Sequence, residues 1–161
     1  MESQGILEDS ISPYLFPMVV MNKRENKKRL WFEYRKLNQI KKKDSYPLPH
    51  IDELLSVLGG AKYYSTLDAL SGFWKIPLSY QTKEKTAFSP GPGLGFYQFT
   101  VLPFGLTNTP AVFQRTMETI LKPTLWKSAV VLIDDIKIFS NTWEKRLSDL
   151  RSVFELFKST N

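Results

Sequence analysis

The sequence contains no cysteine, which excludes disulfide bonds and thiolate metal sites. His50 is the only histidine, so a zinc site built from several histidines is also excluded. No apolar run approaches the roughly 18 residues of a membrane-spanning helix, and residues 1–10 are polar and acidic, without a secretory pattern. We therefore expect an intracellular protein, cytoplasmic or nuclear, that contacts no membrane.

Apolar residues occupy 42% of the 161 positions and aromatic residues 14%, enough to build the core of one domain or of part of one. The net charge of +6 is unevenly distributed, because residues 22–43 carry many cations and only two acids. Clustered basic charge is typical of a polyanion partner, although a solvated charged hairpin gives the same pattern. The cations of this basic segment are Lys23, Arg24, Lys27, Lys28, Arg29, Arg35, Lys36, Lys41, Lys42 and Lys43.

Two adjacent aspartates, Asp134 and Asp135, lie between two short apolar runs, residues 130–133 and 136–139. The pattern predicts two largely buried β-strands with the carboxylates at their turn. Two like charges held side by side resist joint ionisation unless a cation shares them. Aspartate pairs are also common in ordinary solvated turns, so the hairpin alone leaves both interpretations open.

A third carboxylate, Asp68, ends another strand-like run at residues 63–67. We expect it to converge with Asp134 and Asp135. Three carboxylates from two strands would form a hard site made only of oxygen ligands, which suits magnesium. Such a site can support two-metal phosphoryl transfer, with the ions about 4 Å apart.

The remaining strands follow from alternating apolar residues and from glycine and proline breaks. The first two are expected to form a hairpin with a basic turn at residues 22–28. The expected strands outside the aspartate hairpin are residues 17–21, 29–34, 63–67, 74–78, 86–88 and 96–101.

Three helices are expected. The first covers residues 50–58 and is ended by two glycines, and the second begins near Pro110, with Thr109 as its cap, and stops before Pro123. The third begins at Asn141 with a capping box. Interleaved strands and helices predict an α+β fold: an antiparallel sheet with helices on one face. The apolar stripe of the third helix is Leu147, Leu150, Phe154 and Phe157.

Eight short motifs of this sequence resemble motifs of the reverse transcriptase region of a gypsy-type LTR retrotransposon Pol polyprotein. They occur in the same order and at the same spacing as in that family. The resemblance extends over about residues 5–158. The motifs are Arg35-Lys36-Leu37-Asn38, Tyr46-Pro47-Leu48-Pro49, Thr66-Leu67-Asp68, Ser71-Gly72-Phe73-Trp74, Lys85-Thr86-Ala87-Phe88, Leu102-Pro103-Phe104-Gly105-Leu106, Pro110-Ala111-Val112-Phe113-Gln114 and Ile133-Asp134-Asp135.

The resemblance implies the fingers and partial palm of a right-hand polymerase. Residues 1–43 would be fingers and residues 44–161 palm, with a fingers insertion near residues 80–110. The rest of the palm, the thumb and ribonuclease H would be absent from this chain and belong to a longer Pol polyprotein. We therefore expect the stripe of the last helix to be exposed.

The resemblance also implies an RNA-directed DNA polymerase that extends a primer 3′-hydroxyl with dNTPs on an RNA or DNA template. Asp68, Asp134 and Asp135 would be the catalytic carboxylates and would hold two Mg²⁺ ions, for which Mn²⁺ can substitute. The backbone of Ala69 would lie at the metal site, and with Leu70 would cradle the triphosphate.

Further nucleotide contacts are implied by the same resemblance. Arg29, with either Lys23 or Arg24, would clamp the triphosphate, because cations stabilise the charge that moves during phosphoryl transfer. Phe73 occupies the position of a steric gate, whose ring excludes a ribose 2′-hydroxyl. Phe104 would lie beside the nucleotide.

Template-primer contacts are implied for Arg35, Leu132 and Ile133. The family usually has tyrosine where this chain has Leu132, and leucine keeps the apolar bulk without the hydroxyl. We expect weaker primer placement, with metal binding retained. The alternative function is a truncated or catalytically dead retrotransposon remnant that keeps the fold and binds nucleic acid.

Overall fold

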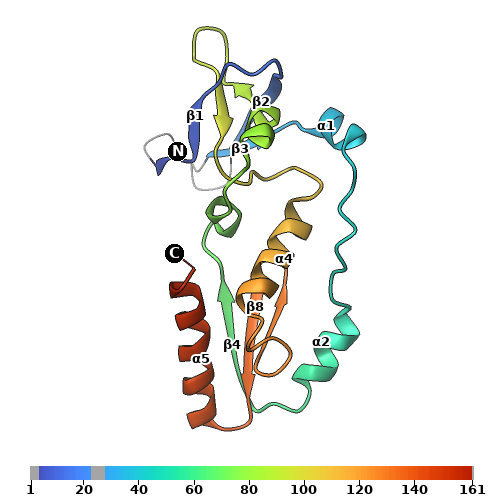
Figure 1. Cartoon of the computed structure of the whole chain (residues 1–161), viewed down its shortest axis with the longest axis vertical. Coiled ribbons are helices and arrows are strands. Elements are labelled where there is room, and N and C mark those ends of the chain that lie inside the picture. The colour runs from blue at the N-terminus through green and yellow to red at the C-terminus, as the bar shows by residue number, and fades with distance from the viewer. Residues whose placement is uncertain (1–3, 23–27, 161) are drawn as a thin grey trace. The chain divides into compact units, whose positions relative to one another are not determined.

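The computed structural model describes residues 4–22 and 28–160. The backbone divides into two compact units, each with its own sheet (Figure 1). The first unit consists of residues 1–43 and 71–109, and the second of residues 44–70 and 110–161. The expected turn at residues 22–28 lies largely outside the described residues.

The first unit contains a five-stranded sheet. Its neighbouring strands are antiparallel, except that β2 and β5 pair in parallel. The expected hairpin of two strands is present as the β2–β3 pair, with Val20 opposite Leu30. In sheet order, the strands are β1 (Leu7–Asp9), β6 (Tyr97–Phe99), β5 (Phe88–Ser89), β2 (Phe16–Asn22) and β3 (Lys28–Phe32).

An aromatic cluster forms the core of the first unit. The ring of Phe32 lies edge-on to Phe88 and Phe99, with centroids 4.7 and 4.9 Å apart. Tyr34 is buried beside them and donates a hydrogen bond to the Thr86 carbonyl at 3.0 Å. Burial raises the pKa of Tyr34 well above its ordinary value. The short helices of this unit are α1 (Arg35–Ile40), η3 (Gly72–Lys75), α3 (Tyr80–Lys83) and η4 (Glu84–Thr86).

The side-chain amide of Asn38 joins two of the sequence motifs in this unit. It donates to the Gly105 carbonyl at 2.8 Å and accepts from the Thr107 amide at 2.9 Å. Gly105 has φ +95°, and a Cβ there would come within 3.4 Å of the Phe32 carbonyl and the Tyr34 ring. Glycine fits this close, left-handed position without strain.

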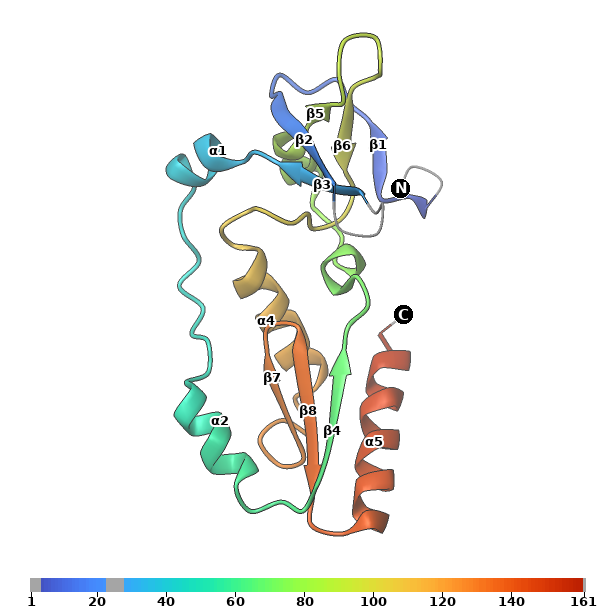
Figure 2. The same ribbon diagram turned by 180° about the vertical axis from the view of Figure 1, so that it is seen from behind.

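The second unit contains a three-stranded antiparallel sheet with β8 between β4 and β7 (Figure 2). Side chains alternate across a strand, so Phe139 faces Val130 and the α2 residue Leu54, while Ile136 and Ile138 face the other way. Helix α5 lies along β4 and β8. The elements are α2 (Ile51–Leu58), β4 (Tyr63–Asp68), α4 (Thr109–Ile120), β7 (Ala129–Leu132), β8 (Asp135–Ser140) and α5 (Trp143–Lys158).

Several predicted elements are wrong in detail. Residues 74–78 do not form a strand, because η3 begins after Ser71, whose φ is 53°, and Pro77 makes only an isolated bridge. Thr86 lies in η4 and not in a strand. The strand expected at residues 96–101 is shortened to β6. Helices α1 and α3 were not predicted, since each is short and carries little apolar periodicity.

The helix caps also differ from the prediction. Thr109 is the first residue of α4 and not its cap, and its hydroxyl donates to the Pro103 carbonyl. The cap of α5 is Thr142 and not Asn141, because the Thr142 hydroxyl accepts the Lys145 amide at 3.2 Å. In the described part of the chain, no helix is long and apolar enough to cross a membrane.

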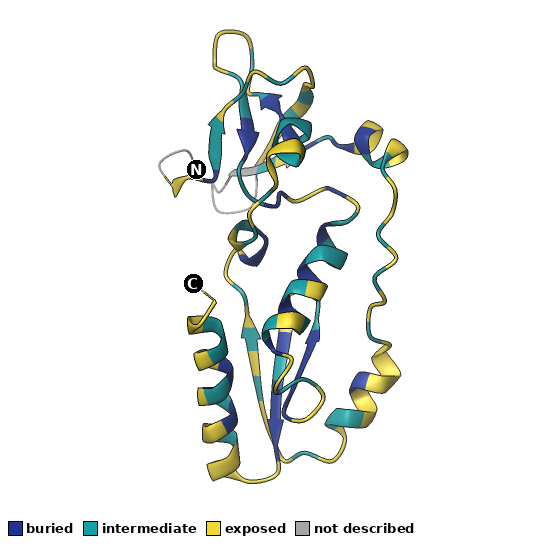
Figure 3. Cartoon of the chain, in the orientation of Figure 1, coloured by how far each residue is buried: buried dark blue, intermediate teal, exposed yellow. Residues whose placement is uncertain are grey.

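Helix α5 exposes part of its apolar stripe, as expected. Leu147 and Phe154 are 52% and 55% exposed, whereas Asp149 and Val153 are buried against the sheet (Figure 3). Asp149 accepts a hydrogen bond from Ser140 at 2.7 Å, so the buried face of α5 is partly polar.

Two phenylalanine truncations should separate buried from exposed packing. Phe113 in α4 is fully buried, so Phe113→Ala should lower the free energy of unfolding by about 3–5 kcal/mol. Phe154→Ala removes an exposed ring and should change that free energy by less than about 0.5 kcal/mol. Urea unfolding measures both. Equal losses would contradict the packing described for the second unit.

Candidate active site

The register between β4 and β8 places two aspartates opposite each other. Asp68, the last residue of β4, pairs with Asp135, the first residue of β8, and Leu67 pairs with Ile136 behind them. Directly opposed residues in antiparallel strands have Cα atoms about 4.5–5.5 Å apart. Asp134 precedes Asp135 in the turn. The structure therefore brings all three carboxyl groups to one end of the three-stranded sheet.

The three carboxylates interact electrostatically. Partial burial, together with the negative charges of Asp68 and Asp135, raises the pKa of Asp134. All three residues are solvent-exposed, so water screens the repulsion between them. Their proximity makes ionisation of Asp134 costly and makes a bound cation favourable.

The side chains are not gathered around an ion position. Among the residues that the structure describes, no group of three or more Asp, Glu or His side chains is already arranged to hold a metal. The donor set nevertheless consists of carboxylate oxygens, which hard divalent cations prefer. The strand register thus fixes the backbone positions of these ligands, and a bound cation would have to draw the side chains together.

The turn between β7 and β8 has an unusual backbone. Ile133 adopts φ 53°, a left-handed conformation that is unfavourable for a β-branched residue. Its amide donates to the side-chain oxygen of Gln114 at 2.7 Å, and Gln114 is fully buried in α4. Sequence reasoning assigned Gln114 no role, although a glutamine beside the apolar face of a predicted helix could have drawn attention to it.

The predicted site residues that follow Asp68 differ in their exposure to solvent. Ala69 is half-buried and Leu70 is 89% exposed. Phe73 belongs to the first unit, where it is only 6% exposed. Its ring meets that of Phe104 edge-on at 83°, with centroids 4.9 Å apart, and Phe104 is 45% exposed.

Of the predicted basic residues, only Arg29 and Arg35 belong to the part of the chain that the structure describes. Lys23 and Arg24 lie outside the described residues, and Arg29 is placed in β3 opposite Met21. Arg35 begins α1 with its side chain 84% exposed, and its guanidinium lies 2.7 Å from the Glu33 carboxylate.

Leu132 and Ile133 differ in their packing. Leu132, opposite Asp135 in the sheet, packs against the apolar cluster of Leu54, Val130 and Phe139. At this position leucine therefore contributes to the core of the second unit. Ile133 is half-buried in the turn.

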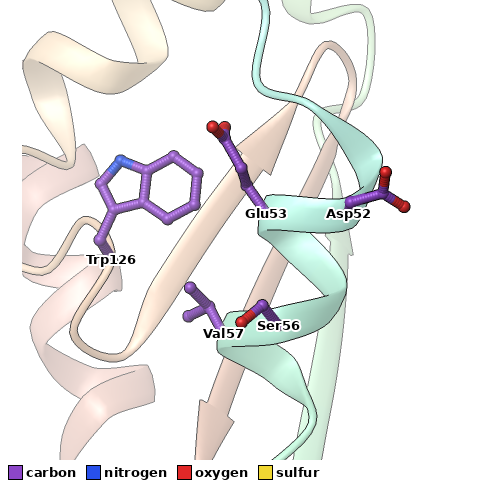
Figure 4. A pocket seen from close by; sticks show the side chains of 5 residues that line it. All are labelled: Asp52, Glu53, Ser56, Val57 and Trp126. Carbon is purple, nitrogen blue, oxygen red and sulfur yellow. The ribbon is translucent and has the colours of Figure 1, made fainter.

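A shallow pocket of about 580 Å³ opens elsewhere in the second unit, between α2 and the loop that precedes β7 (Figure 4). The indole of Trp126 faces Glu53 and Val57 of α2. Neither Asp68 nor the aspartate pair lines this pocket. The candidate site is thus the carboxylate-bearing sheet end and not this pocket.

The comparisons with known proteins concern almost the whole chain. A sequence model of the family described as "Reverse transcriptase (RNA-dependent DNA polymerase)" matches residues 21–161. The chain is 41% identical over 166 residues to the "Retrovirus-related Pol polyprotein from transposon 297" of Drosophila melanogaster. It is 37% identical over 163 residues to that from transposon gypsy of the same organism. The two alignments cover 100% and 98% of this chain but only 16% of each polyprotein.

A solved structure has a similar fold. It is described as "Structure of the foamy viral protease-reverse transcriptase in complex with RNA/DNA hybrid", and it superposes with a TM-score of 0.84 at 28% identity. The match covers 96% of this chain and 20% of the viral one. The α+β fold described above is therefore the fold of reverse transcriptase fingers and partial palm.

The raised pKa of Asp134 predicts a pH-dependent effect of Asp134→Asn on the metal-free protein. The folded state binds this proton more tightly than the unfolded chain, so its stabilisation is present in acid. It is lost as the pH rises above the ordinary value of 3.8 and through the raised pKa.

Asp134→Asn replaces the carboxylate by a neutral amide, so the variant does not lose stability when the pH rises. At pH 7 it should raise the free energy of unfolding, by less than about 1 kcal/mol because solvent screens the charges. The gain should fade towards pH 3 and can be followed by urea unfolding across this range. A gain that is largest in acid would contradict the described electrostatics.

Proposed function

Since the chain belongs to the reverse transcriptase (RNA-dependent DNA polymerase) family, we propose that it carries the polymerase centre of an RNA-directed DNA polymerase. The reaction would be template-directed nucleotidyl transfer from a dNTP to a primer 3′-hydroxyl. The observation that carries the proposal is the register that pairs Asp68 with Asp135, with Asp134 adjacent. This arrangement brings carboxylates from β4, from the β7–β8 turn and from β8 to one end of the same sheet.

Reverse transcriptases generally use Mg²⁺. In this chain Asp68, Asp134 and Asp135 would hold two such ions, with Mn²⁺ as a substitute. When bound, the ions lower the pKa of the attacking hydroxyl and neutralise charge on the phosphates and the leaving group. The three carboxylates themselves contribute a concentrated negative charge, which attracts the cations.

Two groups of residues would bind the triphosphate: the backbone just after Asp68 and the cations of the basic segment. The backbone of Ala69 and Leu70 would face it, with Ala69 also adjoining the metal site. Arg29, with Lys23 or Arg24, would supply the cationic clamp. The high exposure of Leu70 is consistent with a backbone that is open to a ligand.

Phe73 would exclude ribonucleotides, because a ribose 2′-hydroxyl would clash with its ring. The edge-on contact with Phe104 supports this role, since a ring held in one orientation discriminates better than a mobile one. Phe104, which is partly exposed, would adjoin the nucleotide.

The template-primer would be contacted by Arg35, Leu132 and Ile133. The exposed guanidinium of Arg35 supports a phosphate contact, for which it would exchange its ion pair with Glu33. Leu132 would support the primer only through apolar contact and through the strand that it anchors. An RNA/DNA hybrid is the partner named for the similar foamy viral protein.

The subdomain limits are also proposed. Residues 1–43 would form fingers and residues 44–161 palm, with a fingers insertion near residues 80–110. The division of the backbone after residue 43, with residues 71–109 in the first unit, supports these limits. The rest of the palm, the thumb and ribonuclease H would be contributed by other segments of an intracellular Pol polyprotein.

Primer extension on poly(rA)–oligo(dT) with Mg²⁺ tests the proposed function. The chain should be assayed alone and in place of the matching segment of the transposon 297 polyprotein. In the grafted protein we expect extension, and Asp68→Asn or Asp135→Asn should lower its rate by at least about 100-fold. The control Asp9→Asn changes an exposed carboxylate of β1 and should leave the rate unchanged.

A grafted protein that extends no primer would overturn the proposed function. Activity that survives Asp68→Asn would overturn the assignment of the carboxylates.

A further inference from the structure

The backbone conformation of Ile133 decides where the carboxylates of Asp134 and Asp135 lie, because these two residues follow it directly. A left-handed φ at a β-branched residue is unfavourable in isolation, so surrounding contacts must hold it. Within the described residues, the side chain that bonds to the Ile133 amide belongs to Gln114 of α4.

Gln114 bonds twice to the chain segment that leads from β7 into the turn. Its side-chain oxygen accepts from the Ile133 amide at 2.7 Å, and its nitrogen donates to the Val131 carbonyl at 2.9 Å. The residue is fully buried, so water does not compete for these bonds. Both contacts are to backbone atoms, so they constrain the path of the chain into Asp134 and Asp135 and not its side chains.

Glu118 determines which way the Gln114 amide points. One turn further along α4, its carboxylate oxygen accepts from the same Gln114 nitrogen at 2.7 Å. Rotating the amide by half a turn would set its oxygen against this carboxylate and against the Val131 carbonyl, three acceptors without a donor. The Gln114 oxygen is therefore kept facing the Ile133 amide.

Glu118 is itself fixed by the segment at residues 44–46. The Tyr46 hydroxyl donates to the second oxygen of Glu118 at 2.5 Å. The guanidinium of Arg115 lies 4.7 Å from the centre of the Tyr46 ring and binds both oxygens of Asp44 at 2.7 Å. The contacts run without interruption from this segment, through α4, to the turn.

We propose that Gln114 is a positioning residue for Asp134 and Asp135, and that Tyr46 and Glu118 set the orientation of its amide. The contacts stand on the geometry alone. Their consequence for ion binding rests on the proposed function. The reason for such a device is that ligand carboxylates must be held to within a fraction of an ångström, although this turn is intrinsically strained.

The test compares Gln114→Met with Gln98→Met. Both replace a buried glutamine by an apolar side chain of similar length. Gln98 lies in the first unit, where it bonds to Glu8 and Ser10. A loss common to both variants therefore reports general destabilisation, and an effect confined to Gln114→Met reports the turn.

The first measurement is residue-resolved amide hydrogen exchange by NMR on the full chain. In Gln114→Met the Ile133 amide should exchange about tenfold faster than in the wild type, after correction for global stability. Gln98→Met should leave it unchanged, and Tyr46→Phe should give a smaller acceleration. An unchanged Ile133 amide in Gln114→Met, or an equal change in Gln98→Met, would overturn the proposal.

The second measurement is Mn²⁺ affinity, determined by electron paramagnetic resonance without nucleotide or primer. Residues that orient metal ligands typically contribute 10–100-fold to affinity, so Gln114→Met should weaken Mn²⁺ binding about tenfold. Gln98→Met should bind like the wild type. A wild-type chain that binds no Mn²⁺ would count against the proposed function, whereas the exchange of Ile133 would still decide whether Gln114 holds the turn.

Discussion

Three negative charges meet at the end of a sheet whose other residues are mostly apolar, and the β4–β8 register is the constraint that brings them there. The position of β8 is firmly set because Ile136 and Ile138 are almost completely buried. A slip of one residue would exchange the two faces of β8, take Ile136 and Ile138 out of their packed positions and separate Asp68 from Asp135. Burial of the strand interiors thus offsets the repulsion at their ends.

Helix α4 serves this arrangement in two ways. Phe113 and Met117 are buried in the core, whereas Gln114 bonds to the turn and Glu118 bonds to the Gln114 amide. Packing and positioning therefore come from adjacent residues of one helix. This pairing explains why a fully buried glutamine is stable in an otherwise apolar core: its oxygen and nitrogen both have partners.

Much of this could be predicted from the sequence, for identifiable reasons. Two short apolar runs on either side of the aspartates predicted the hairpin, and the strand-like run that ends at Asp68, together with the family motifs, indicated that Asp68 belongs with it. Local patterns failed at residues 72–75, which follow the left-handed Ser71 and form a 3₁₀ helix although Trp74 and Ile76 alternate like strand residues. The role of Gln114 could not be predicted, because it depends on a bond to the backbone of Ile133, 19 residues away.

The central claim is that Asp68 and the aspartate pair share divalent ions although they come from distant parts of the sequence. Titration of the wild type, Asp68→Asn and Asp52→Asn with Mn²⁺, monitored by electron paramagnetic resonance, tests it most directly. Asp52 lies on α2, outside the carboxylate site. The account predicts that Asp68→Asn loses most of the Mn²⁺ affinity while Asp52→Asn retains it. Wild-type affinity in Asp68→Asn would contradict the account.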